Sequence, residues 1–382
     1  MKKMTKDSFK LGFIGGGLNS AVGNVHRIAA QMDCRWSLEA GCFSTNKDIN
    51  FETGTQWGIK RSRVYENWHD FLKNEKGNLD AICILTPTPM HSEIALEAIN
   101  LGFAVICEKT LAASTREAAS ICNAVESKKG FLVVTYNYTG YPMLRELRQM
   151  LRDGKLGNLK QIQIEMPQEG FARLDKQGRF PTVQDWRLKD GEIPIVSLEL
   201  GAHLHHIIYF LTGEKPLEVV ADQSSFGFFE QVVDNIMCLA RYTGNLRSQI
   251  WYSKSALGHR NGLRIRVYGD KGSAEWFQME PEILHFNDVN GNVQVIDNAS
   301  NVNLANKVRY NRFKPGHPTG FIEAFANHYY DLADSLQEFK RTGNFSSPWV
   351  FTAIDAKEGL EMLDAITTSS KNNCWQPVND DS

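Results

Sequence analysis

Three consecutive glycines, Gly15, Gly16 and Gly17, constrain the fold of this chain more than any other feature. They follow a short apolar run at residues 9–14 and precede residues 20–32, where apolar side chains recur at helical spacing. Glycine allows the positive φ angles of a tight turn and the close approach of a ligand to the backbone. Because a helix N-terminus offers unpaired N–H groups and a partial positive charge, this unit predicts a site for the phosphates of a dinucleotide.

The glycine triplet alone would equally suit a plain tight turn, so the prediction depends on the segments that follow it. Strand-like and helix-like segments alternate along the first part of the chain. Strands are predicted at residues 38–43, 80–85, 103–107 and 131–136, and helices at residues 68–73, 92–100 and 114–128. Alternating strands and helices imply a parallel sheet with right-handed crossovers. We therefore predict a Rossmann dinucleotide-binding domain over residues 1–138 of an α/β protein.

The pattern changes after residue 138. Helices are predicted at residues 142–152 and 199–211, and closing helices at residues 320–339 and 350–369. Between residues 219 and 296 several β-rich runs are separated by turn residues, which is typical of a mostly antiparallel sheet. The sequence thus predicts a second, α+β domain over residues 139–382.

Bulk properties exclude several classes of protein. With 382 residues the chain is long enough for two domains, and its formal net charge of -2 provides no basic field to attract nucleic acid. No apolar run approaches the roughly 18–20 residues that span a bilayer. Residues 1–10 are polar and lack the apolar stretch of a signal peptide. We expect no nucleic-acid partner and no membrane partner.

The cysteines indicate a reducing compartment. The chain has seven, an odd number, and no pair has CxxC spacing. Cys83 and Cys107 lie inside apolar strand-like runs, where a thiol behaves as a small core residue. We therefore expect a cytoplasmic protein without a disulfide framework, a zinc cluster or another metal site.

The end of the second predicted strand bears on the choice of cofactor. A site that prefers NAD usually carries an acidic residue here to hold the ribose 2′-hydroxyl, but the first acid in this chain is Asp48. Ser44, Thr45 and Lys47 could instead bind a 2′-phosphate. We expect NAD or NADP, with NADP favoured, although Lys47 would also suit a solvated loop.

Seven segments together carry a family resemblance. They read GFIGGG at 12–17, LTPTPMH at 85–91, CEKT at 107–110, TYNYTGYPM at 135–143, QDWR at 184–187, LGAHLHHIIYFLTG at 200–213 and HPTGFIEAFANHYYD at 317–331. In these segments and their order, the chain resembles the glucose–fructose oxidoreductase / inositol dehydrogenase / MocA (Gfo/Idh/MocA) family over nearly its whole length. The resemblance implies an NAD(P)-dependent oxidoreductase that acts by hydride transfer on a secondary hydroxyl of a sugar, sugar derivative or cyclitol.

The resemblance also implies a set of site residues. Those that would contact the cofactor, in addition to the loop after the second strand, are Gly15, Gly17, Leu18, Asn19, Thr86, Pro87, His91, Glu108, Lys109, Asn137, Trp186 and Arg187. Lys109 is also implied at the substrate, and His203 as the proton-handling residue. Of these, His91 could instead be a helix-start residue and Trp186 a core residue. The second domain of such enzymes often forms a homodimer or homotetramer.

The chemistry explains these residue types. Oxidising an alcohol releases a proton together with the hydride, and a histidine with a pKa near neutrality suits its removal. A lysine can orient the hydroxyl and stabilise charge that develops on its oxygen. Glu199 precedes His203 by about one helical turn and could orient the imidazole. Glu199, His203 and His206 would also suit a metal by their spacing, but the resemblance assigns His203 to proton transfer.

Departures from the family pattern surround this site. Ser20 stands at the third glycine position, with Gly23 further on, which predicts a lengthened turn. Thr110 replaces the proline of the EKP segment, and Glu199 replaces the usual aspartate. The glycine-rich run that normally precedes it reads IPIVS at 193–197. Two alternatives therefore stay open: a redox-neutral glycosidase or epimerase with tightly bound NAD, and a non-catalytic sugar- or nucleotide-binding protein on the same fold.

Overall fold

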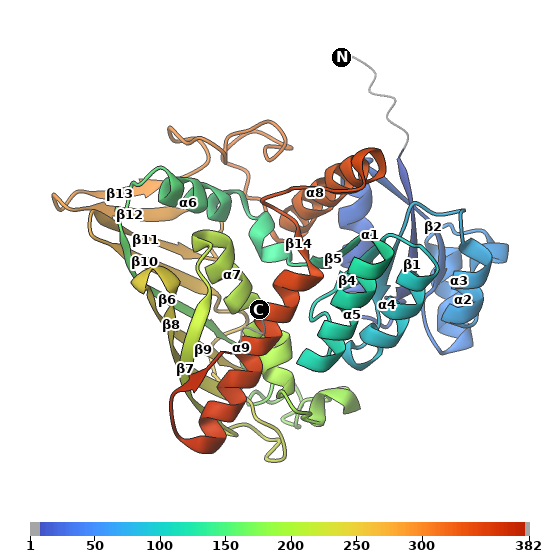
Figure 1. The fold of residues 1–382 in the computed structure, drawn as a ribbon, viewed down its shortest axis with the longest axis horizontal. Helices are drawn as coiled ribbons and strands as arrows, with labels where there is room; N and C mark the ends of the chain where they lie inside the picture. The colour runs from blue at the N-terminus through green and yellow to red at the C-terminus, as the bar shows by residue number, and fades with distance from the viewer. Residues whose placement is uncertain (1–7, 379–382) are drawn as a thin grey trace. The chain divides into compact units, whose positions relative to one another are not determined.

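The structure, a computed structural model, describes residues 8–378 and divides into two compact units (Figure 1). The first unit contains residues 8–112, 116–140 and 321–357, and the second contains residues 113–115, 141–320 and 358–378. Of the polar N-terminal stretch that argued against a signal peptide, residues 1–7 lie outside the described part of the chain. Within the described residues, no helix is long and apolar enough to cross a membrane.

A six-stranded sheet forms the centre of the first unit. Its strands are β1 (Phe9–Gly15), β2 (Trp36–Cys42), β3 (Ala81–Leu85), β4 (Val105–Glu108), β5 (Leu132–Thr135) and β14 (Phe351–Thr352), in the order β14-β5-β4-β3-β1-β2. The first five strands pair in parallel, and the short β14 pairs antiparallel with β5. The order reverses direction between β1 and β3, which creates the crevice at the carboxyl ends of the strands where such sheets bind ligands. The predicted Rossmann domain is confirmed.

The helices of this unit are α1 (Gly23–Met32), α2 (Lys47–Gln56), α3 (Trp68–Glu75), α4 (His91–Asn100), α5 (Thr115–Lys128) and α8 (Phe321–Thr342). Helix α1 begins three residues later than its apolar spacing predicts, so the turn after β1 is longer, as Gly23 suggested. The sequence did not predict α2, because its residues lack an apolar stripe. The side chain of Asn46 begins α2 by accepting hydrogen bonds from the backbone N–H groups of Asp48 and Ile49.

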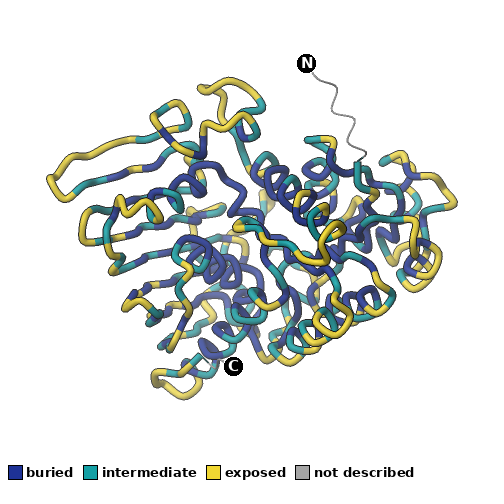
Figure 2. Tube along the Cα trace, turned by 45° about the horizontal axis from the view of Figure 1, so that its top comes forward, coloured by how far each residue is buried: buried dark blue, intermediate teal, exposed yellow. Residues whose placement is uncertain are grey.

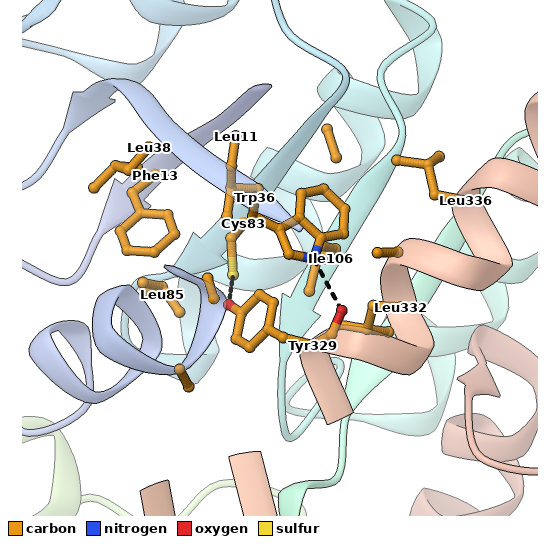
Figure 3. Close-up of a cluster of buried hydrophobic side chains, with 14 of the residues drawn as sticks. Leu11, Phe13, Trp36, Leu38, Cys83, Leu85, Ile106, Tyr329, Leu332 and Leu336 are labelled. Carbon is orange, nitrogen blue, oxygen red and sulfur yellow. Dashed lines mark hydrogen bonds between the residues drawn. The ribbon is translucent and has the colours of Figure 1, made fainter. Parts of the chain in front are cut away.

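Helix α8 completes the core of the first unit (Figure 3). Tyr329, Leu332 and Leu336 on α8 pack in one buried cluster with Leu11 and other side chains of the parallel sheet. The indole Nε1 of a further cluster member, Trp36, donates to the backbone oxygen of Tyr329 at 2.9 Å. The sequence pattern assigned residues 321–357 to the second domain, and this assignment is corrected here. A helix packs against the surface that fits its apolar face, and for α8 this is the sheet of the first unit, although the helix follows the second unit along the chain.

A nine-stranded sheet forms the second unit. Its strands are β6 (Leu159–Pro167), β7 (Pro216–Ser224), β8 (Asn235–Tyr242), β9 (Arg247–Ser253), β10 (Arg264–Gly269), β11 (Gly272–Phe277), β12 (Leu284–Asp288), β13 (Val293–Ile296) and β15 (Gln376–Pro377). They follow the order β13-β12-β11-β10-β6-β9-β8-β7-β15, antiparallel except for the β6–β9 pair. The mostly antiparallel sheet is confirmed, and the sequence analysis had overlooked β6.

One face of this sheet carries helices α6 (Pro142–Arg152) and α7 (Ala202–Thr212). A π-helical turn, Ser197–Gly201, precedes α7, so the helix predicted from residue 199 begins at Ala202. Helix α9 (Ala353–Asn372) begins in the first unit and continues in the second. Exposed positions gather in loops and hairpin ends, whereas the strands are mostly buried or intermediate (Figure 2). In β8 the side chains alternate between buried and more than half exposed at Met237 and Leu239.

Candidate functional site

Two positions of the turn after β1 favour glycine. Gly15 and Gly16 have φ angles of +85° and +77°, in the left-handed region that side chains rarely adopt. A Cβ on Gly15 would lie 2.7 Å from the carbonyl carbon of Leu85 on β3. A Cβ on Gly23 would lie 1.7 Å from the carbonyl oxygen of Gly16, so α1 and the turn touch through backbone atoms alone. Gly23 thus performs the close-packing role that the family pattern gives to the third glycine.

The departure at Ser20 has a structural explanation. The Ser20 hydroxyl lies 3.3 Å from the backbone N of Val22 and 3.4 Å from that of Gly23, and it accepts from both at the start of α1. The first turn of α1 contains no acidic residue, so its positive end is not opposed by a side chain. Leu18 lies in the same turn, and its N–H donates to Thr53 Oγ1 at 3.1 Å. The turn is therefore well ordered before any ligand binds.

Two buried polar atoms at the carboxyl edge of the sheet lack a hydrogen-bond partner among the described residues. They are Thr86 Oγ1, directly after β3, and Asn137 Nδ2, shortly after β5 in the short helix Asn137–Gly140. An unsatisfied buried polar group costs about 1–3 kcal/mol. Together with the glycine turn at the reversal of strand order, these atoms fit a dinucleotide, which would satisfy them. Both residues were named from the sequence, and Pro87 follows Thr86 at an exposed position.

The loop after β2 holds the residues expected to meet a 2′-phosphate. Ser44 is partly exposed, and its hydroxyl accepts from the backbone N of Asn46 at 3.2 Å. Thr45 is exposed. Lys47 begins α2, and its Nζ lies 2.7 Å from Glu66 Oε1, with both side chains more than half exposed. The lysine charge thus already has a nearby carboxylate, which makes Lys47 a weaker marker of a phosphate site.

His91 connects the ends of two strands. It is buried at the start of α4, with Nδ1 2.7 Å from the carbonyl oxygen of Thr110 and Nε2 2.8 Å from that of Thr86. Burial lowers the pKa of His91, against the two carbonyl contacts, which raise it. A neutral ring has one N–H, so one of the two nitrogens donates. His91 therefore begins α4 and supports the loops that contain Thr86 and Lys109, and its contact with a cofactor stays a prediction.

Glu108 lies in a buried polar cluster below the expected catalytic lysine. Its Oε1 accepts from Thr135 Oγ1 at 2.5 Å and lies 3.2 Å from Nε2 of His26 on α1. The Nδ1 of His26 lies 2.8 Å from the hydroxyl of Tyr329, which in turn contacts Cys83 Sγ at 3.5 Å (Figure 3). Burial acts to raise the pKa of Glu108, but the hydrogen bond and charge of His26 outweigh it and lower the pKa.

Lys109 follows Glu108 directly and is half-buried, with a cis peptide bond to Thr110. The sequence analysis named Glu108 and Lys109 but missed His26, Thr135 and Tyr329. Their role depends on contacts between segments that are distant along the chain, which the sequence alone does not reveal. Cys83 and Cys107 are fully buried in β3 and β4, which confirms them as core thiols.

The second unit holds a separate cluster of charged side chains. Nε of Arg187 lies 2.7 Å from Glu199 Oε1, and Nζ of Lys254 contacts the other oxygen, Oε2. The Arg187 guanidinium also lies 5.0 Å from the centre of the Trp186 ring, and the Trp186 Nε1 donates to Gln184 Oε1 at 3.1 Å. The sequence analysis missed Lys254, which follows β9 in a segment without a family motif.

His203 lies in the first turn of α7 and is 6% exposed. Glu199 lies in the π-helical turn before it and is held by the two cations, so its role in orienting His203 remains a prediction. His205 packs in the core, with Nδ1 3.2 Å from Met362 Sδ, and burial lowers its pKa to about 4. Across residues 8–378, no group of three or more His, Cys, Asp or Glu side chains is arranged to hold a metal ion.

Comparison with known proteins agrees with this architecture. Residues 9–136 match the family described as an oxidoreductase family with an NAD-binding Rossmann fold, and residues 144–275 match the GFO/IDH/MocA C-terminal domain. The chain belongs to the Gfo/Idh/MocA family of oxidoreductases. Its N-terminal unit is the NAD-binding Rossmann domain of that family, and its C-terminal unit is the sheet domain, as the sequence motifs predicted.

Relatives match the chain along most of its length. The uncharacterized oxidoreductase YfiI of Bacillus subtilis (strain 168) is 29% identical over 383 residues, which cover 95% of each chain. A crystal structure of an oxidoreductase from Sinorhizobium meliloti is 31% identical, with a TM-score of 0.83 over 96% of this chain and 99% of its own. An inositol dehydrogenase homolog from Azotobacter vinelandii, complexed with NADH and myo-inositol, shares the fold at 24% identity, with a TM-score of 0.87 over 97% of this chain and 98% of its own.

Proposed function

We propose that this protein is an NAD(P)-dependent oxidoreductase that interconverts a secondary hydroxyl and a ketone on a sugar, sugar derivative or cyclitol. The main support is the glycine turn at the strand-order reversal, together with the unpartnered atoms Thr86 Oγ1 and Asn137 Nδ2. Family membership and the complex of a structural relative with NADH and myo-inositol add support. When bound, the nicotinamide supplies the hydride acceptor or donor.

The chain's own residues handle the proton and the substrate oxygen. His203 accepts the hydroxyl proton at an imidazole nitrogen during oxidation and returns it during reduction. Lys109 orients the hydroxyl and stabilises negative charge on its oxygen. Glu199, held by Arg187 and Lys254, supplies a fixed carboxylate four residues before His203. The chain thus contributes a base, a cation and an anchored anion.

The cofactor contacts form a second part of the proposal. Gly15, Gly17, Leu18 and Asn19 would meet the pyrophosphate, and the residues proposed to reach other parts of the dinucleotide are Ser44, Thr45, Lys47, Thr86, Pro87, His91, Glu108, Lys109, Asn137, Trp186 and Arg187. A preference for NADP depends on Lys47 leaving Glu66 to meet a 2′-phosphate. The ratio of kcat/KM for the two cofactors, in wild type and Lys47→Ala, tests this preference.

The catalytic proposal is tested by following reduced nicotinamide absorbance with a panel of polyols, sugars and cyclitols and both cofactors. Lys109→Ala and His203→Ala should each lower kcat/KM at least about 100-fold, in the range for loss of a general acid–base group. Lys73→Ala, on the exposed side of α3, is the matched control and should leave turnover unchanged. No absorbance change with any substrate and either cofactor would reject the proposal.

The same experiment separates two other functions. Glycoside cleavage or epimerisation without net reduced nicotinamide, by protein with cofactor that never exchanges, would identify a redox-neutral enzyme. Sugar binding without any turnover would identify a binding protein. Mass spectrometry of co-purified small molecules distinguishes these outcomes before any substrate is known.

We also propose that the protein forms a homodimer or homotetramer in a reducing compartment such as the cytoplasm. Support for assembly comes from the sheet of the second unit, where Met237, Leu239 and Leu217 are each more than half exposed. The buried free thiols of Cys42, Cys83, Cys107 and Cys238 support a reducing compartment. Light scattering on wild type and Met237→Glu tests the assembly, which should dissociate in the variant.

A further inference from the structure

Lys254 belongs to the charged cluster of the second unit, although no sequence motif marks it. It follows β9 directly and is 9% exposed. Its backbone is held on both sides, because its N–H donates to the carbonyl oxygen of Asp234 at 2.7 Å and its carbonyl accepts from the N–H of Phe171 at 2.8 Å. The lysine is therefore positioned by the fold and is not a flexible surface side chain.

The loop that holds Lys254 is itself braced by a buried carboxylate. Asp234 is fully buried and accepts from the backbone N of Phe226 at 3.0 Å and of Gly227 at 2.7 Å. It also accepts from the hydroxyl of Ser255 at 2.9 Å, directly after the lysine. A ligand that meets the Lys254 ammonium would thus meet a preorganised group, which limits the entropy lost on binding.

Two cations of this cluster contact one carboxylate. Arg187 and Lys254 share the single carboxylate of Glu199. Two cations also share one carboxylate at Glu169. Its Oε1 lies 2.8 Å from Nη1 of Arg173 and 2.9 Å from Nε of Arg260. Each carboxylate therefore faces two cations.

The two clusters are connected through Phe171. The Lys254 ammonium lies 5.7 Å from the centre of the Phe171 ring, which is itself buried. Phe171 follows Glu169 by two residues, so the aromatic ring and the second cluster belong to one short segment. A buried aromatic ring thus lies beside the Lys254 ammonium, and this pairing suits a ligand with a carbon skeleton and an anionic group.

A buried cation without a full counter-charge is costly, and an anionic ligand can remove that cost. The ammonium carries three N–H donors, and Glu199 Oε2 occupies one direction around it. From these observations we propose that Lys254 and Arg187 recognise a carboxylate on the substrate, which is an acidic sugar such as a hexuronate or an aldonate. The carboxylate is bound and left unchanged. This inference rests on the proposed oxidoreductase function and narrows its substrate class.

The first test uses wild-type protein and matched pairs of sugars. D-glucuronate, D-galacturonate and D-gluconate are compared with D-glucose, D-galactose and D-glucitol, each with NAD and NADP. Turnover is followed by nicotinamide absorbance, and binding by the shift in melting temperature. We expect kcat/KM at least about 10-fold higher for the acids, the advantage of one charge-assisted hydrogen bond. Added salt should raise the KM of the acids and leave that of the neutral sugars unchanged.

The second test changes the lysine. Lys254→Met should raise the KM for the acids about 10- to 100-fold more than the KM for the neutral sugars, and any loss of kcat that comes through Glu199 should be the same for both. Lys254→Arg, which keeps the charge, should restore most of the preference. Lys160→Met is the matched control, because it removes an ammonium of the same unit that is 60% exposed on β6. Circular dichroism shows whether each variant folds.

The outcomes are distinct. Equal losses for acidic and neutral sugars in Lys254→Met would make the lysine a structural counter-ion of Glu199 and overturn the inference. Turnover restricted to neutral sugars in wild type would also overturn it and leave the oxidoreductase function standing. Stabilisation by the acids alone without any turnover would reject the oxidoreductase function but retain the anion site. No turnover with any acidic or neutral sugar, together with no stabilisation by the acids, would overturn both.

Discussion

Replacing Gly23 by Ala tests whether the approach of α1 to the glycine turn determines both stability and cofactor binding. The new Cβ would lie 1.7 Å from the carbonyl oxygen of Gly16, 2.4 Å from its carbonyl carbon and 2.7 Å from its Cα. Because the opposing atoms are backbone, no side-chain rotation relieves the contact. The start of α1 must move away by more than 1 Å before the separation reaches the 3.0 Å that real Cβ contacts respect.

This displacement sets the expected loss of stability and the expected loss of cofactor affinity. Overpacking a close contact costs about 1–3 kcal/mol, and a clash of backbone with backbone lies at the upper end. Alanine recovers up to about 1 kcal/mol through its higher helix propensity. The free energy of unfolding should therefore fall by about 2 kcal/mol. Because the displaced N–H groups and helix dipole would bind the pyrophosphate, the Kd for the dinucleotide should rise at least about 10-fold.

Urea unfolding followed by circular dichroism measures the stability, and fluorescence titration with NAD and NADP measures the Kd. Gly130→Ala is the matched control in the same unit. A Cβ there would meet its nearest neighbour at 3.5 Å, an ordinary contact, and its φ is not positive, so the substitution should be neutral or stabilising by up to about 1 kcal/mol. A Gly23→Ala protein with the urea midpoint and cofactor Kd of wild type would refute the reasoning.

Three further predictions concern buried polar groups. Thr86→Val and Asn137→Leu remove unpartnered polar atoms, so each should leave the unfolding free energy within about 1 kcal/mol of wild type while raising the cofactor Kd about 10-fold in fluorescence titrations. Glu108→Gln breaks the buried pair with His26 and should cost about 3 kcal/mol near neutral pH. The folded-state pKa of Glu108 is lowered from 4.5, so its contribution to the free energy of unfolding is present above that pH and lost as the pH falls. The difference in unfolding free energy between variant and wild type, measured in urea, should therefore shrink at acid pH. The pKa of His205 falls from 6.5 to about 4 on folding, so the unfolded chain takes up the proton first as the pH falls. Relative to His205→Gln, the free energy of unfolding of wild type should therefore decrease by about 2 kcal/mol between pH 7.5 and pH 5.

Each of these predictions has a contradicting result. An unchanged cofactor Kd in Thr86→Val and Asn137→Leu would remove both residues from the cofactor site. A Glu108→Gln deficit that persists undiminished in acid would mean that packing, and not ionisation, carries the contribution of Glu108. A His205→Gln protein whose stability falls with wild type between the two pH values would show that another group titrates there.

The local elements of the first unit were predictable because their signals are local. The apolar runs that became β1, β3 and β5 stand out from their polar flanks, and a positive φ at Gly15 follows from the glycine itself. Helix α2 was missed because its residues carry no apolar stripe, and Asn46 starts it through a side-chain cap. Strand β6 was missed although buried and partly exposed residues alternate along it.

The candidate site was predictable only where a motif marks it. Thr86, Asn137, Lys109 and His203 stand in family segments and were named with their places after strands or on a helix. Lys254 stands in no such segment, and its contact with Glu199 joins residues more than fifty positions apart. Spacing along the chain cannot reveal such a pair, since neither residue alone differs from an ordinary surface ion.

The sequence by itself determined the strand–glycine turn–helix unit, the parallel and antiparallel halves of the chain and the family to which they belong. These properties depend on periodicity, on the conformational freedom of glycine and on short motifs, all of which are read within a few neighbouring residues. Only the tertiary structure decided that α8 completes the first core, that Glu108 pairs with His26, and that Glu199 is shared by Arg187 and Lys254. Burial and ion pairing act across space, so the partners of a side chain are set by folding and not by its neighbours in the chain.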